Sequence, residues 1–418
     1  MQKWLQKRGF KIIFYNIVVV FLILLGIEVY LGYQINHSES TPDWMYKPLR
    51  LYYHEYELNT FQYHPQNAHY DSTLFYALNP GTSRFDTPEF RTVFRVNSGC
   101  FRDDEYSLES PQVIVLGDSY TMGWGVEQHE TFAEIIQRKT GKKVLNTGVS
   151  SYGTARELES IRDVDMDSLE YMIIQYCSND FMENQAFVDQ GNKLVVSGEE
   201  IYNQYVENNL ARKRYYPFKR LLTIPGYFKK TFPTVDKSYA HMSHEEAFME
   251  VLKAADFIPD HVHILVFSVE YELCNDVFVD ALDTLLAKDF TSSLCDRIHT
   301  VRLNSSITKA HRFPFDTHLN PAGHSIVADV ILNHLKQNPP YTGVREWYYP
   351  NGKLCARARY RNGIKDGPFI TYWENGQTSR TASYTRGVQT GIQIDYNQSG
   401  EPKDTTHFPL RKRHEQTN

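Results

Sequence analysis

The 418-residue chain has little cysteine and little net charge, and both shortages exclude classes of protein. Its five cysteines are few and odd in number, which argues against a small domain held together by disulfides. Cys274 and Cys295 flank one predicted helix and could pair in an oxidising compartment, or both could stay free. The formal net charge is only -6, so no overall field favours binding to nucleic acid.

Metal-binding and phosphate-binding patterns are also missing from the sequence. No group of histidines, cysteines and aspartates has the spacing of a zinc site, and no glycine-rich segment could cradle a phosphate group. We therefore expect neither a metal nor an organic cofactor. Hydrophobic residues nevertheless make up 41% of the chain, which is enough for an ordinary core, and the length allows two or three domains.

One long apolar run lies near the N-terminus. Residues 12–33 have membrane-spanning length and are interrupted only by Asn16 and Glu28. The short segment before this run, residues 1–11, is basic, which favours a cytoplasmic location for it. The rest of the chain is then expected outside the cytoplasm, in a periplasmic or extracellular compartment. No small-residue cleavage site follows, which favours an uncleaved anchor over a removed signal peptide.

The middle of the chain has the pattern of an α/β domain. Residues 34–110 are rich in tyrosine and proline and are expected to form a stem with a few lead-in strands, one of them near 92–96. From 111 to 338, strand and helix patterns alternate, which predicts a parallel sheet joined by right-handed crossovers. The predicted strands are 112–116, 143–146, 170–176, 262–268 and 298–302. The predicted helices are 130–139, 153–163, 244–254, 276–288 and 321–336.

One interval interrupts this alternation. Residues 205–237 contain eight lysines and arginines interleaved with aromatic residues. Insertions of this length in a compact domain are usually functional or disordered. Three interpretations remain open: a lid over a site, a patch that touches anionic glycans or lipid head groups, and a solvated insertion without a function.

Residues suited to nucleophilic catalysis follow the predicted strands. The run 113–116 ends at Gly117-Asp118-Ser119, which displays a serine at the carboxyl edge of the sheet, where open α/β sheets bind their ligands. Serine needs a base, an acid that orients the base, and donors for the developing oxyanion. His318 lies in a loop just before the last predicted helix, and Asp316 is close enough in sequence to orient its imidazole.

Two other strand ends offer oxyanion donors. Gly148 follows the second strand and lets a backbone N–H approach a substrate closely, while Asn179 follows the third strand and offers a side-chain amide. With the N–H of Ser119, they would supply three donors.

In their order along the chain, these blocks resemble those of the SGNH (GDSL) hydrolase family over residues 111–338. The matching blocks are Gly117-Asp118-Ser119, then Gly148, then Asn179-Asp180, then Asp316 with His318. The resemblance implies a flavodoxin-like three-layer sandwich and ester or acyl-group chemistry without a metal. It implies that Ser119 is the nucleophile, that His318 is the general base and acid, and that Asp316 orients it. The implied oxyanion hole consists of Ser119, Gly148 and Asn179.

The last block departs from the family pattern in its spacing. The commonest form is Asp-x-x-His, whereas one residue alone separates Asp316 from His318 in this sequence. Either Asp316 still reaches the imidazole from its shifted place, or the serine and histidine work as a dyad.

The C-terminal part is repetitive. The segment Tyr348–Gly352 recurs at 372–376 and 396–400, each time 24 residues on. Asn-Gly pairs at 351–352 and 375–376 predict type I′ hairpins. The pattern resembles MORN-type repeats over residues 345–402. Such repeats usually serve as structural or interaction modules, so we expect them to pack on the sheet domain or to bind a protein or envelope partner.

These features together predict a single-pass, outward-facing serine esterase with a polar tail at 403–418. Its expected substrate is an ester, with O-acylated glycans of the bacterial envelope as the suggested class. Two alternatives stay open: an O-acyltransferase of the same fold, and a catalytically inactive scaffold that binds envelope components through the repeats.

Overall fold

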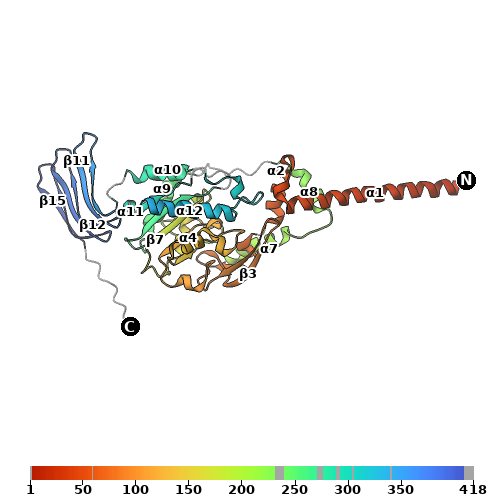
Figure 1. Ribbon diagram of the computed structural model, residues 1–418, viewed down its shortest axis with the longest axis horizontal. Coiled ribbons are helices and arrows are strands. Elements are labelled where there is room, and N and C mark those ends of the chain that lie inside the picture. Colours follow the sequence, from red (N-terminus) through yellow and green to blue (C-terminus); the bar gives the residue numbers. More distant parts are fainter. Residues whose placement is uncertain are drawn as a thin grey trace.

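The computed structural model describes residues 2–58, 60–230, 240–270, 276–288, 292–303, 306–338 and 341–408. Along its longest axis the chain forms an isolated helix, an α/β domain and an antiparallel sheet (Figure 1). Cys274 lies outside the described residues, so its pairing with Cys295 stays a prediction.

Five parallel strands form the centre of the α/β domain in the order β6-β5-β7-β8-β9. They are β5 (Val113–Leu116), β6 (Val144–Asn146), β7 (Tyr171–Tyr176), β8 (His263–Ser268) and β9 (Ile298–Thr300). Each coincides with a strand predicted from the sequence. This order, in which the first strand lies between the second and third, is flavodoxin-like.

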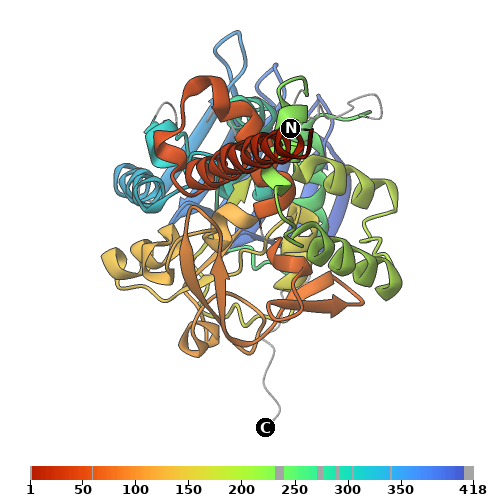
Figure 2. The same cartoon turned by 90° about the vertical axis from the view of Figure 1, so that its right-hand side faces the viewer.

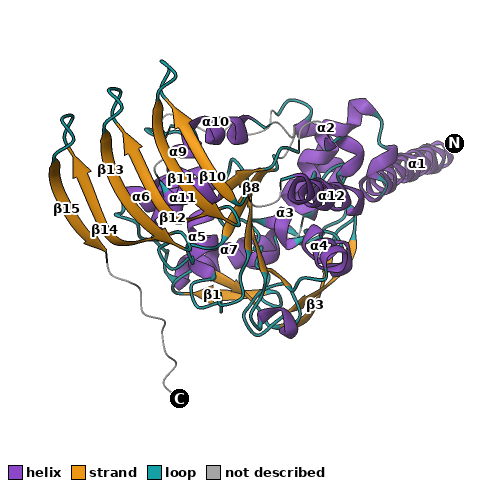
Figure 3. Ribbon diagram, turned by 60° about the vertical axis from the view of Figure 1, so that its left-hand side comes forward, coloured by secondary structure: helices purple, strands orange, loops and turns teal. Residues whose placement is uncertain are grey.

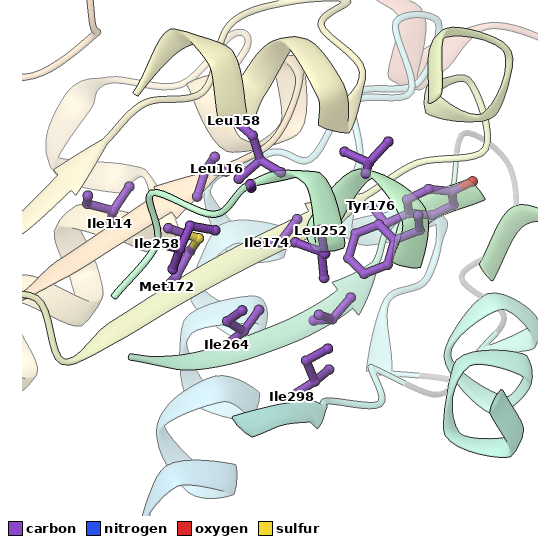
Figure 4. Packing of buried hydrophobic residues seen from close by; sticks show 14 of the residues in the cluster. Ile114, Leu116, Leu158, Met172, Ile174, Tyr176, Leu252, Ile258, Ile264 and Ile298 are labelled. Atoms are coloured by element: carbon purple, nitrogen blue, oxygen red, sulfur yellow. The ribbon is translucent and has the colours of Figure 1, made fainter. Parts of the chain in front are cut away.

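Helices cover both faces of this sheet. One layer holds α4 (Phe132–Thr140) and α12 (Pro321–Gln337); the other holds α5 (Thr154–Ser160), α9 (His244–Ala254) and α10 (Val277–Leu286). Val113 and Val115 face the first layer, whereas Ile114 and Leu116 face the second, whose core is shown in Figure 4. Successive strand residues point to opposite faces, so a strand covered on both sides must be apolar throughout. The three-layer α/β fold is confirmed.

Residues 34–110 pack against the carboxyl edge of the sheet instead of forming a stem. They form α2 (Asp43–Tyr52) and two hairpins, made of β1 (Ala68–Asp71) with β2 (Phe75–Leu78) and β3 (Gly81–Asp86) with β4 (Arg91–Val96). β4 covers the strand predicted near 92–96. The apolar residues of the hairpins share one cluster with Trp124 and Val149, which follow strands β5 and β6.

The basic insertion is helical. After α6 (Asp180–Asp189), the chain forms α7 (Glu199–Arg212) and α8 (Lys219–Tyr227), and part of the insertion, 231–239, lies outside the described residues. Ile224 and Tyr227 of α8 are buried in one cluster with residues of α1 and α2.

The N-terminal helix α1 (Gln2–Asn36) extends away from the domain (Figure 1). Within the described part of the chain it is the one helix long and apolar enough to cross a membrane, over Phe10–Asn36, and no residue of 10–27 is buried in the protein. Its length, composition and exposure fit the anchor predicted at 12–33.

The C-terminal repeats form a six-stranded antiparallel meander in chain order (Figure 3). Its strands are β10 (Gly343–Tyr348), β11 (Leu354–Arg361), β12 (Ile364–Tyr372), β13 (Thr378–Thr385), β14 (Val388–Tyr396) and β15 (Pro402–Phe408). β15 extends into the segment expected to be a polar tail, and residues 409–418 lie outside the described part.

The prediction of type I′ turns at 351–352 and 375–376 is wrong. A type I′ turn needs positive φ at both central residues, but at these two turns the glycine alone has it. Pro350 precedes the first pair, and its ring favours the ordinary type I turn because it holds φ near about -65°. The two-residue turn between β11 and β12 does have the type I′ pattern, with φ of 51° at Asn362 and 76° at Gly363.

The repeat sheet docks on the amino ends of the parallel strands. His263, the first residue of β8, donates from Nε2 to the carbonyl of Asn362 at 2.8 Å. The Lys365 ammonium, only 1% exposed, lies 2.8 Å from the Asp296 carboxylate of α11 (Ser293–Arg297).

Replacing Lys365 should loosen this contact. In Lys365→Met, the buried Asp296 carboxylate loses its cation, which costs about 3 kcal/mol when a buried pair is broken on one side. Urea unfolding of the detergent-solubilised chain, followed by tryptophan fluorescence, measures this loss. Arg361→Met is the matched control, because that ion pair is exposed and exposed pairs contribute about 0–1 kcal/mol. Equal stability of the two variants would contradict the prediction.

Candidate active site

The turn after β5 sets the position of Ser119. Gly117 has φ of 152°, and a Cβ there would lie 2.2 Å from the Thr121 hydroxyl oxygen, so glycine is required. Asp118 then caps α3 (Ser119–Met122) by accepting from the Tyr120 N–H at 3.0 Å. Ser119 is therefore the first residue of a short helix at the carboxyl edge of the sheet.

The loop before α12 brings the predicted histidine to this serine. Ser119 Oγ lies 2.7 Å from His318 Nε2, and His318 Nδ1 is hydrogen-bonded to Asp316 Oδ1. An ionised carboxylate can only accept, so we assign the ring proton to Nδ1. Nε2 is then the acceptor for the Ser119 hydroxyl, which is the arrangement that a general base requires.

The short Asp316–His318 spacing is accommodated by a tight turn. Asp316 Oδ1 also accepts from the backbone N–H of His318 at 3.3 Å, and Thr317 between them has φ of 71°. The side chain of Asp316 thus folds back over one residue to reach the imidazole. Of the two alternatives left open by the sequence, this geometry matches the shifted acid and not the dyad.

Two residues not predicted from the sequence complete the surroundings of Asp316. Trp124 Nε1 donates to Asp316 Oδ2 at 3.0 Å, and its indole stacks on the His318 ring with centroids 5.0 Å apart. The Tyr53 hydroxyl donates to the same oxygen at 3.3 Å. Both oxygens of the Asp316 carboxylate therefore accept hydrogen bonds. The orientation of the His318 imidazole is fixed by its hydrogen bond to this carboxylate and by stacking on the Trp124 indole.

Glu89 fastens the loop itself. It accepts from the backbone N–H of Phe315 at 2.9 Å and of Asp316 at 2.8 Å, one on each carboxyl oxygen, and it also accepts from the Ser38 hydroxyl. Burial raises the pKa of Glu89 to about 7. No sequence motif marks Glu89, Tyr53 or Trp124, because each lies far from the loop in the chain.

The three predicted oxyanion donors differ in availability. The Ser119 N–H has no acceptor among the residues that the structure describes, and Asn179 uses one amide proton in a long contact of 3.4 Å to Asp118. The Gly148 N–H donates instead to Asn146 Oδ1 at 3.0 Å. A Cβ on Gly148 would lie 2.3 Å from a backbone nitrogen of α3, so this glycine permits close packing of the loop on that helix.

Electrostatics single out Asp316 among the acids near the site. Burial alone would raise its pKa, but the adjacent His318 imidazole and its hydrogen bonds lower the pKa overall. In contrast, burial first and neighbouring charges second raise the pKa values of Asp180 and Glu157, and burial raises that of Asp118. The surroundings thus lower the pKa of Asp316 and raise the pKa values of the other three acids. Asp316 is therefore the carboxylate that stays ionised and can stabilise an imidazolium.

Comparisons with known sequences match the C-terminal part of the chain. A family model described as MORN repeat variant matches residues 341–362, which cover β10 and β11. No curated protein sequence matches the chain.

Several solved structures resemble about half of this chain. Similar structures include phospholipase A1 from Streptomyces albidoflavus NA297 (12% identity, 54% of this chain and 99% of that chain, TM-score 0.32). Another is a putative lipolytic protein of the G-D-S-L family from Desulfitobacterium hafniense DCB-2 (12% identity, 53% and 97%, TM-score 0.28). A third is the salicylyl-acyltransferase SsfX3 from a tetracycline biosynthetic pathway (16% identity, 55% and 55%, TM-score 0.26). None of these likenesses assigns a role to a residue of this chain.

Substituting Glu89 should destabilise the loop in a pH-dependent way. In Glu89→Gln, one backbone N–H faces an amide NH₂ instead of an acceptor, which costs about 1–3 kcal/mol. Since burial raises the folded-state pKa from 4.5 to about 7, Glu89 contributes stability that is full below pH 4.5 and is lost as the pH rises through 7. The deficit of the variant should therefore shrink between these pH values.

Thermal unfolding at several pH values measures this deficit. Glu105→Gln is the matched control, because Glu105 also accepts from a backbone N–H, that of Ser98 at 2.7 Å, but in an exposed turn. A deficit for Glu89→Gln that grows with pH would refute the prediction.

Proposed function

We propose that this chain is a membrane-anchored serine esterase of the SGNH class, with its catalytic domain in a periplasmic or extracellular compartment. The observation that carries the proposal is the hydrogen-bonded series from Ser119 through His318 to Asp316 at the carboxyl edge of the sheet. The apolar helix α1 supports the anchored location.

In the first half of the proposed reaction, Ser119 Oγ attacks the carbonyl carbon of an ester while His318 Nε2 takes the hydroxyl proton. The carbonyl π electrons move to oxygen, and the Ser119 N–H with the Asn179 amide would stabilise that oxyanion. Asp316 stabilises the imidazolium that forms. His318 then gives its proton to the leaving alcohol, the carbon–oxygen bond breaks, and the acyl group remains on Ser119.

In the second half, His318 Nε2 takes the proton of an acceptor hydroxyl while the hydroxyl oxygen attacks the acyl carbonyl carbon. The bond from that carbon to Ser119 Oγ then breaks, and His318 returns the proton to Ser119. Water as the acceptor makes the protein an esterase, and a sugar hydroxyl makes it an O-acyltransferase. The two share every residue of the site, so the acceptor alone separates them. O-acylated envelope glycans are the substrate class that we propose from the external location.

Replacing the nucleophile should abolish both covalent labelling and turnover. We expect wild-type protein to react with a fluorophosphonate probe and to hydrolyse p-nitrophenyl acetate with a burst. Ser119→Ala should lose the label and lower turnover by about 10³-fold or more, as loss of a triad nucleophile does. Ser399→Ala, in an exposed turn of the repeats, should behave as wild type.

A second measurement separates the enzyme from an inactive scaffold. If neither wild type nor Ser119→Ala is labelled, the scaffold alternative gains and the nucleophile assignment is wrong.

The fate of the acyl group distinguishes esterase from transferase. With an acetyl ester as donor and a glycan present, we expect the esterase to release free acetate at a rate independent of glycan concentration. Acetylated glycan appearing at the expense of acetate would assign the transferase reaction instead. Mass spectrometry of the glycan together with an acetate assay measures both products.

A further inference from the structure

The helix that would cross the membrane carries a buried acid joined to the basic insertion. Glu28 of α1 is only 4% exposed. Its two carboxyl oxygens accept from the backbone N–H groups of Arg220 at 3.4 Å and Leu221 at 2.9 Å, in the first turn of α8, and the Arg220 guanidinium lies 3.7 Å away. A carboxylate at a helix N-terminus, beside a guanidinium, is a strongly favourable arrangement.

This contact places the start of α8 at membrane depth. Glu28 follows Lys11, the last residue of the N-terminal basic group, by 17 residues, or about 25 Å along a helix that rises ~1.5 Å per residue. The hydrocarbon core of a bilayer is about 30 Å thick. Phe218, the residue before α8, contacts Phe21 even further into the span, with ring centroids 5.8 Å apart. The start of α8 therefore lies beside the outer part of the span.

The surface around this contact has the composition of a membrane interface. The large apolar side chains exposed on it are Trp44 of α2, Tyr215, Tyr216, Leu222 of α8 and Phe228. Leu222 is 70% exposed and Trp44 67%, and the Trp44 ring stacks on Phe228. Exposed Lys229 and Lys230 follow directly. Aromatic residues with flanking basic residues are typical of the head-group region.

The same surface is joined to the catalytic loop. Leu31 and Ile35 of α1, residues of α2 and α8, and Phe315 form one buried cluster. Phe315 directly precedes Asp316, and its carbonyl accepts from His54 Nε2 at 2.8 Å, just beyond α2. Figure 2, which looks along α1 from its N-terminus, shows α2 and the green insertion gathered at the base of this helix. The carboxyl edge of the sheet thus faces the end of the anchor.

We propose that α2, the 215–218 segment and α8 form a membrane-contacting surface, which we call the α2/α8 surface, that rests in the outer leaflet of the bilayer entered by α1. Building on the proposed function, the site is then held at the membrane face, and the O-acylated glycan on which it acts is one carried by a lipid of the bilayer. The Glu28 contact to Arg220 offsets the cost of a carboxylate within the span.

The depth of Trp44 tests the surface directly. Full-length protein is reconstituted in phosphatidylcholine–phosphatidylglycerol vesicles with and without lipids brominated on the acyl chain near the head group. The fluorescence lost in Trp44→Phe is the signal of Trp44, and we expect the brominated lipids to quench it. The signal lost in Trp373→Phe, from the repeat sheet, should not be quenched.

Each result decides between this proposal and the proposed function. An unquenched Trp44 signal in protein that sediments with vesicles overturns the α2/α8 surface and leaves the anchor standing. Quenching of both tryptophans also overturns it, because the contact would then not be specific to this face. If the protein fails to sediment with vesicles, that result refutes both the membrane anchor proposed at α1 and the α2/α8 surface.

Activity gives an independent test. Leu222→Glu should lower turnover of an acyl ester embedded in vesicles by about fivefold, which corresponds to ~1 kcal/mol for a charge placed near the interface. Its turnover of soluble p-nitrophenyl acetate should be unchanged. Ile392→Glu is the matched control, an exposed apolar residue on the repeat sheet. Equal turnover of the embedded ester by both variants would refute the proposal, whereas a wild type inactive on both esters would refute the proposed function alone.

Discussion

A buried, ionised carboxylate is the constraint around which the site is assembled. Asp316 is only 1% exposed, and an ion removed from water costs several kcal/mol unless its oxygens are hydrogen-bonded. Trp124 and Tyr53 supply donors from two distant segments, and His318 supplies one from the same loop. Because each segment must reach the same carboxylate, the region before the sheet cannot be a loose stem. It has to fold onto the carboxyl edge, and its many aromatic residues form the core that keeps it there.

The direction of the parallel strands then organises the whole chain. All five carboxyl ends point to one edge, where the serine, the histidine loop and the end of the anchor meet. All five amino ends point to the opposite edge, where the repeat sheet docks through His263 and Lys365. The repeats and the anchor therefore lie at opposite ends of the molecule (Figure 1). With the proposed bilayer at the end of α1, the repeat sheet would lie at the far end of the molecule, away from the membrane.

Much of this arrangement could be predicted from the sequence, because its signals are local. Strand β5 is apolar throughout and stops at a glycine that no other residue could replace, so both the strand and the position of Ser119 follow from the seven consecutive residues 113–119. Tyr53 and Glu89 could not be found in this way. The Tyr53 contact to Asp316 spans 263 residues, and neither residue type is unusual for its segment. The type I′ turn mispredicted at 351–352 shows a local failure, because Pro350 outweighs the Asn-Gly pair that follows it.

The rigid connection between anchor and site constrains the substrate by geometry. A catalytic domain on a flexible stem could sample substrates over a wide distance from the membrane, since a flexible chain extends with the square root of its length. Here α1 passes within seven residues into α2, and the cluster that buries Leu31 also buries Phe315, next to Asp316. With α1 in a bilayer, as proposed, such a site could not move away from the membrane without breaking its own support. An O-acylated glycan carried by a membrane lipid would then be continuously within its reach, whereas a glycan far from the bilayer would have to be brought to it.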